Sequence, residues 1–220
     1  MSAHDSRVSS GTPATAPGPR ANDRALPAPG QGLRPAPAGS HMLSAHPGDH
    51  LSLMPGQLYF GSKAATVRTL LGSCVAITLW HPQRRLGGMC HYLLPVRAKA
   101  APESLEGRFG AEAVALMVQR LRLAGTETHE YVTHLYGGAD TQAGLGGPRA
   151  AIGERNIEMG WQLIDHYGFQ LEAVDVGDDV PRTVSMDLRS GDVQVKRGAA
   201  IRKPLLPPAP ADSAPRRKSP

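Results

Sequence analysis

Short apolar segments with the alternation typical of β-strands recur through this chain, and they constrain its fold more than any other feature. Four of them precede any helix-length segment, and three follow one another near the end. The segments are 57–60, 66–71, 75–80, 86–94, 131–136, 169–176, 183–188 and 192–196. The last two are separated by Arg189-Ser190-Gly191, a glycine-containing connection that predicts a hairpin.

Two segments among the strands have helical periodicity instead. In 110–124, one stripe contains Ala113, Leu116, Met117, Ala124 and either Leu121 or Arg120, and Gly125 is the expected stop. In 153–167 the apolar residues at helical spacing are Ile157, Trp161 and Ile164, and Gly168 follows. We expect both stripes to face a core.

The order of these elements predicts the fold class. A doubly wound parallel sheet needs strict alternation of strands and helices, whereas here strands follow strands, which favours antiparallel pairing. We therefore predict an α+β fold: a single domain of mixed, mostly antiparallel β-sheet layers, flanked by helices on one or both outer faces. No internal repeat is visible.

Proline marks the expected limits of this domain. Of 20 prolines, 8 lie in residues 1–47 and 6 in residues 204–220. Neither end has an apolar period, so burial there does not offset the entropy of ordering the chain. We predict a disordered Pro/Ala/Gly-rich tail at 1–47, a folded domain at 48–202 and a disordered basic tail at 203–220.

Charge and targeting signals limit the function. The net charge is +5, but residues 1–47 and 202–220 carry +2 and +4, which leaves −1 for the rest. A nucleic-acid binder concentrates positive charge on a folded face, so no nucleic-acid partner is expected. No apolar run reaches the roughly 20 residues of a membrane span, and no secretory signal is present, so we expect no membrane insertion. Two cysteines without an export signal indicate a reducing cytoplasm and free thiols.

Both cysteines lie in one predicted hairpin, LLGSCVAITLW-HPQRR-LGGMCHYLLP, and its register decides what they face. A turn centred on Pro82-Gln83 places Cys74 opposite His91, and a loop of 82–85 makes them diagonal neighbours on the same face. A slip of one residue puts them on opposite faces. Cys90 points to the other face and is expected in the core.

A cysteine beside a histidine is a candidate nucleophile with its base. An ordinary thiol is only a few per cent thiolate at neutral pH, and an adjacent imidazole can withdraw its proton. A hydroxyl that orients the imidazole completes a triad, and Thr69 is the candidate for that role. The alternative is structural, because buried cysteines and satisfied strand histidines are common.

Other motifs are weaker. His129 and His134 are five residues apart rather than the four that a helical zinc site needs, so no metal is expected. Gly137-Gly138 either shapes a cleft that a substrate backbone approaches closely or forms a tight turn.

Several spaced motifs together resemble the chemoreceptor glutamine deamidase family CheD, over about residues 51–197. They begin with the nucleophile segment and continue in the family's order to the last predicted strand. The matching segments are Leu71-Gly72-Ser73-Cys74-Val75, Gly87-Gly88-Met89, His91 with Leu94-Pro95, Tyr136-Gly137-Gly138-Ala139, Ile152-Gly153-Glu154-Arg155-Asn156-Ile157, Asp175-Val176-Gly177, Arg182-Thr183-Val184 and Ser190-Gly191-Asp192-Val193. The segment 177–182 departs from the family's glycine pattern.

This resemblance implies a cysteine hydrolase without a cofactor, which converts glutamines of methyl-accepting chemotaxis receptors to glutamate and releases ammonia. It places the nucleophile on Cys74, the base on His91 and the third member on Thr69. Gly72, Ser73, Gly137 and Gly138 are the expected substrate-binding residues, with backbone N–H groups of 72–74 holding the oxyanion. A CheC-like phosphatase is the further expected partner. The alternative function is a non-catalytic chemotaxis adaptor that binds receptors or such a phosphatase.

Overall fold

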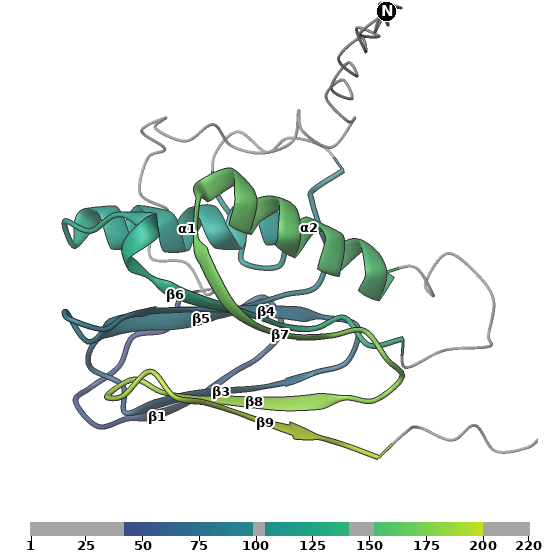
Figure 1. The fold of residues 1–220 in the computed structure, drawn as a ribbon, viewed down its shortest axis with the longest axis horizontal. Helices are drawn as coiled ribbons and strands as arrows, with labels where there is room; N and C mark the ends of the chain where they lie inside the picture. The colour runs from purple at the N-terminus through teal and green to yellow at the C-terminus, as the bar shows by residue number, and fades with distance from the viewer. Residues whose placement is uncertain (1–41, 99–103, 141–151, 200–220) are drawn as a thin grey trace, which may run out of the picture.

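The computed structural model describes residues 42–98, 104–140 and 152–199, and these form three layers (Figure 1). A five-stranded sheet in the middle has the order β2-β5-β4-β6-β7, and a four-stranded sheet below it has the order β1-β3-β8-β9. Both helices lie on the outer face of the five-stranded sheet. The elements are β1 His50–Leu53, β2 Leu58–Gly61, β3 Thr66–Leu71, β4 Val75–His81, β5 Leu86–Tyr92, α1 Gly110–Leu123, a 3-10 turn Thr128–Glu130, β6 Val132–Gly137, α2 Ile152–Tyr167, β7 Gln170–Val176, β8 Arg182–Asp187 and β9 Val193–Arg197.

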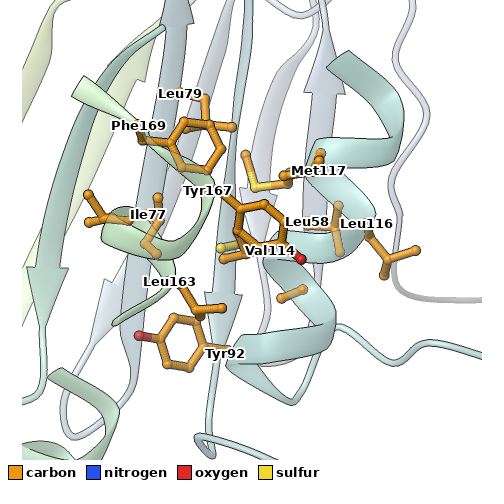
Figure 2. Close-up of a cluster of buried hydrophobic side chains, with 14 of the residues drawn as sticks. Leu58, Ile77, Leu79, Tyr92, Val114, Leu116, Met117, Leu163, Tyr167 and Phe169 are labelled. Carbon is orange, nitrogen blue, oxygen red and sulfur yellow. The ribbon is translucent and has the colours of Figure 1, made fainter. Parts of the chain in front are cut away.

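Burial follows from this layering. Strand β4 lies at the centre of the middle layer, and all of its residues are buried because both of its faces are covered. Strand β3 alternates buried and exposed residues, because only one face of its sheet is covered. One core therefore fills the space between helices and sheet (Figure 2), and a second fills the space between the two sheets.

The predicted α+β class is confirmed, and both helices of the described residues lie on one outer face. Most strand pairs are antiparallel, including the predicted β8–β9 hairpin, while β1–β3 and β6–β7 are parallel. Strand β1 is not among the predicted segments. The prediction that Trp161 faces the core is wrong, because its side chain is 44% exposed, whereas Asn156 and Leu163 of the same helix are fully buried.

The register of the hairpin β4–β5 is the one with the longer loop. His81 pairs with Leu86, so the connection is 82–85, and Ala76 pairs with His91. Because alternate residues share a face, Cys74 and His91 are diagonal neighbours on the same side of the sheet. Cys90 points to the other side and is fully buried in the core beneath the helices, as predicted.

The predicted tails fall almost entirely outside the described residues, which begin at 42 and end at 199. Within the described ranges, neither helix combines the length and apolar character that crossing a membrane requires.

Candidate active site

A chain of hydrogen bonds crosses the space between the two sheets and ends on His91. The Thr69 hydroxyl on β3 donates to the Leu53 carbonyl on β1 at 2.9 Å and lies 2.7 Å from Nδ1 of His91 on β5. Thr69 and His91 are both buried, with exposed fractions of 2% and 1%. The contact exists because β3 directs Thr69, and β5 directs His91, into the same layer, as their neighbours Val67 and Met89 in that core show.

The chemistry of this chain fixes the tautomer of His91. The Leu53 carbonyl only accepts hydrogen bonds, so the single hydroxyl proton of Thr69 goes to it. The Thr69 oxygen must then accept from a protonated Nδ1 of His91. Nε2 is therefore the unprotonated nitrogen, and it has no hydrogen-bond partner among the described residues. The imidazole presents a lone pair that is free to accept a proton.

Burial sets the protonation states. It lowers the pKa of His91 to about 4, although the nearby Leu53 carbonyl acts in the opposite direction. Burial also raises the pKa of the Cys74 thiol above its usual value. Near neutral pH the site thus holds a neutral imidazole and a protonated thiol, which suits general-base transfer of the thiol proton during attack.

Cys74 is partly buried and packs against the core between the sheets, the layer that also contains His91. Both cysteines are free thiols, as predicted. The Cys74 side chain makes no hydrogen bond to Nε2 in this structure. Continuing the hairpin register gives diagonal neighbours at about 7–8 Å between Cα atoms, a separation that side chains can span.

The segment 137–139 holds the backbone around Cys74. Gly138 N–H donates to the Cys74 carbonyl at 2.8 Å, and Ala139 N–H donates to the Gly72 carbonyl at 2.8 Å. Gly137 has a φ of +108°, and a Cβ there would lie 2.3 Å from the Cys74 carbonyl oxygen. The two glycines therefore make a tight turn that also lets two backbones meet beside the nucleophile candidate.

The structure thus brings together residues that the sequence analysis singled out separately. Thr69 contacts His91 directly. Gly138 donates to the Cys74 carbonyl, Gly72 accepts from Ala139, and Gly137 closely approaches the Cys74 carbonyl. Ser73 takes part through its carbonyl oxygen, which accepts a hydrogen bond from Asn156.

Two further residues near this site were not predicted. Asn156 on α2 is fully buried and donates to Ser73, and its side chain interrupts the otherwise apolar buried stripe of the helix. Arg182, also fully buried, donates to the Asp175 carboxylate at 2.7 Å and to the carbonyls of Gly177 and Val180. Two sequence signals bear on Asn156: it is a polar residue inside a helical stripe, and it lies in the segment 152–157 that resembles the family.

Arg182 organises the segment 177–181, whose sequence departs from the family pattern. Its ion pair with Asp175 and the pair between Arg197 and Asp175 lower the pKa of that carboxyl, against the opposing effect of partial burial. The Asp178 carbonyl in turn accepts the N–H of Asp140 at 2.7 Å, directly after the glycine segment. This hydrogen bond connects the segment 177–181 to the chain that follows the glycines beside Cys74.

Among the described residues, no group of three or more His, Cys, Asp or Glu side chains is placed to hold a metal ion. His129 lies in the 3-10 turn and His134 in strand β6, so the two are not on one helix. Burial raises the pKa of Cys90 to about 12, which makes it an inert thiol.

The family model and the relatives that match this chain name the same family. The family model described as CheD chemotactic sensory transduction matches residues 93–197. "Probable chemoreceptor glutamine deamidase CheD 3" of Dechloromonas aromatica (strain RCB) is 43% identical over 153 residues, which are 69% of this chain and 90% of that protein. "Probable chemoreceptor glutamine deamidase CheD 1" of Chromobacterium violaceum is 39% identical over 171 residues, covering 74% of this chain and 88% of that protein.

Among solved structures, the hypothetical protein YfiH of Bacillus licheniformis aligns with a TM-score of 0.34 and 14% identity, over 54% of this chain and 49% of that chain. A likeness at this level supports no inference.

Proposed function

This chain belongs to the CheD family, and on that premise we propose that it is a protein-glutamine glutaminase that deamidates chemoreceptors. The relatives' names supply the substrate class, glutamine side chains of chemoreceptors. One observation in the site supports the assignment of chemistry: the hydrogen bond that Nδ1 of His91 donates to the Thr69 oxygen leaves Nε2 of His91 as a free base on the face that Cys74 shares.

The proposed reaction has two stages. The Cys74 sulfur attacks the side-chain carbonyl carbon of a glutamine while Nε2 of His91 takes the thiol proton. The C–N bond then breaks, and His91 returns that proton to the departing ammonia. Water, deprotonated by His91, hydrolyses the thioester to release glutamate and the free thiol. No cofactor enters this balance.

The remaining roles belong to the same proposal. Thr69 orients His91, and the backbone N–H of Cys74 is the proposed donor to the oxyanion of each tetrahedral intermediate. Gly72, Ser73, Gly137 and Gly138 line the approach for the substrate backbone. The expected setting is the cytoplasm, with methyl-accepting receptors as substrates and a CheC-like phosphatase as a further partner.

The test uses a receptor cytoplasmic fragment, reducing conditions and peptide mass spectrometry. Wild-type protein should convert discrete glutamines to glutamate, with a mass increase of about one dalton each, and Cys74→Ala should abolish the conversion. Cys90→Ala is the matched control, because Cys90 lies in the opposite core, and it should retain activity.

Conversion that persists in Cys74→Ala would remove the nucleophile assignment. No conversion by the wild type with receptors from its own organism would favour the alternative, an adaptor that binds receptors or a phosphatase without catalysis.

A further inference from the structure

The buried amide of Asn156 connects the two backbone segments next to the proposed nucleophile and base. Its Nδ2 donates to the Ser73 carbonyl at 3.0 Å and to the Leu93 carbonyl at 2.8 Å. Ser73 precedes the nucleophile candidate, and Leu93 comes two residues after His91. The side chain reaches these carbonyls from α2, which lies on the outer face of the sheet.

The orientation of this amide follows from its partners. Carbonyl oxygens only accept hydrogen bonds, so the NH₂ group of Asn156 must face both of them. In the flipped amide, Oδ1 would face the two carbonyl oxygens without any donor between them. The Asn156 Oδ1 atom is buried and has no partner among the described residues. An unpaired buried acceptor lowers the stability of the fold. Asparagine at this position is therefore best explained by the two carbonyls that its NH₂ group holds.

Holding the Ser73 carbonyl also aims the next N–H group. In a trans peptide, the C=O of one residue and the N–H of the next point in opposite directions, and the described chain contains no cis peptide. With its carbonyl bound to Asn156, the Ser73–Cys74 peptide directs the Cys74 N–H away from α2. That N–H belongs to the nucleophile itself, where an oxyanion donor is needed.

The Cys74 N–H is also left without an acceptor among the described residues. A regular ladder would pair it with the Gly138 carbonyl, but only the reverse bond, from Gly138 N–H to the Cys74 carbonyl, is present. Gly138 adopts a φ of +68°, and its carbonyl oxygen lies against Gly153 of α2, only 2.5 Å from where a Cβ at Gly153 would stand. The Gly138 carbonyl, the competing acceptor, thus lies against α2 instead of accepting the Cys74 N–H.

We propose that Asn156 is a positioning residue: it fixes the Ser73–Cys74 peptide so that the Cys74 N–H is a free, oriented oxyanion donor beside the nucleophile. This inference rests on the proposed function, in which Cys74 attacks a carbonyl carbon. A role limited to stability would leave the chemistry of Cys74 toward different electrophiles in constant proportion, whereas oxyanion positioning acts on only one kind of attack.

Two small reagents separate these roles. Acetylation of Cys74 by p-nitrophenyl acetate passes through a tetrahedral oxyanion, whereas alkylation by iodoacetamide displaces iodide and forms none. Both rates are measured at one pH on folded protein, with modification of Cys74 verified by mass spectrometry. In Asn156→Ala we expect acetylation to fall about 10- to 100-fold, and alkylation to change by less than about threefold.

Two further variants complete the set. Asn156→Asp keeps the side-chain shape but supplies at most one O–H donor for the two carbonyls, and only when its carboxyl is protonated, so it should show a selective loss in the same direction. Leu163→Ala truncates another fully buried side chain of α2 without touching the Ser73 or Leu93 carbonyls, and it controls for weaker helix packing. It should leave the ratio of the two rates unchanged. Should Asn156→Ala fail to fold, the ratio in Asn156→Asp decides.

The outcomes distinguish this inference from the proposed function. The positioning role would be overturned if the ratio of acetylation rate to alkylation rate were unchanged in both Asn156 variants, or fell equally in Leu163→Ala. This conclusion would hold even where the wild type deamidates receptors. A selective loss of acetylation would uphold it even where the wild type leaves receptors unchanged. In receptor deamidation, the same variants should lose kcat with KM nearly constant.

Discussion

Protonation of His91 should destabilise the folded chain in mild acid, by an amount that follows from its burial. The pKa of this imidazole is about 4 in the folded chain, and about 6.5 is ordinary for an unfolded chain. Between these values the unfolded chain binds the proton and the folded chain does not, so folding stability decreases as the pH falls. The contribution of His91 is complete above about pH 6.5 and is lost progressively down to about pH 4.

The magnitude follows from the difference between the two pKa values. Linkage gives a loss of about 2 kcal/mol at pH 5 relative to pH 7, and about 3 kcal/mol once the pH is below 4. This is large beside a typical total stability of roughly 5–15 kcal/mol. His134 also has a pKa lowered by burial, so the effect of His91 must be isolated by a difference measurement.

The assay is urea unfolding at pH 7 and pH 5, on the wild type and on His91→Gln. Glutamine does not titrate, and its amide can still donate to Thr69. His134 is present in both proteins and cancels. We expect the wild type to lose about 2 kcal/mol more than the variant between the two pH values. An equal loss in both proteins would show that His91 titrates normally, and would refute the claim that burial holds this imidazole neutral.

Two other substitutions test the surrounding contacts. Thr69→Val keeps the shape but leaves the Leu53 carbonyl and the His91 Nδ1–H without a partner, so urea unfolding should show a loss of about 2–4 kcal/mol; Thr69→Ser should lose far less, and equal losses would contradict the hydrogen-bond account. Arg182→Met removes a fully buried guanidinium that donates to one carboxylate and two carbonyls. Because Arg197 still pairs with Asp175, the substitution should cost about 1–3 kcal/mol in the same assay. A loss within about 0.5 kcal/mol, as at an ordinary surface position, would show that the segment 177–181 does not depend on Arg182.

The sequence was most informative where local pattern and long-range order agree. The segments 66–71 and 75–80 were predicted as strands, and they are β3 and β4. For the hairpin 75–94, the sequence left a few registers open. They differ in the length of the loop that follows His81, which the sequence pattern does not determine. Strand β1 escaped prediction because HLSL is short and pairs in parallel with a strand distant in sequence.

The helix α2 shows why the stripe of a helix is hard to read. Its buried positions include Gly153, Asn156 and Gly160, none of which looks apolar in the sequence. At Gly160 an added Cβ would lie 2.6 Å from the Leu135 side chain and 3.0 Å from the Tyr92 hydroxyl, so the small residue permits close packing of helix on sheet. The predicted apolar stripe through Trp161 therefore lies to one side of the face of α2 that is actually buried. Contacts made by backbone and amide groups, such as those of Asn156, leave no periodic signal.

The candidate site depends on both sheets, and this division has a chemical consequence. Strand β5 of the five-stranded sheet directs His91 into the space between the sheets, and Cys74, directly before β4, packs against the same core. Thr69 and Leu53 come from the four-stranded sheet. The tautomer of the imidazole is thus set by residues on the opposite sheet. Separation of the two sheets would free Nδ1, hydrate the ring and return its pKa toward the ordinary value. The packing between the sheets therefore controls the proton chemistry of His91, although none of the apolar residues that provide this packing takes part in the reaction.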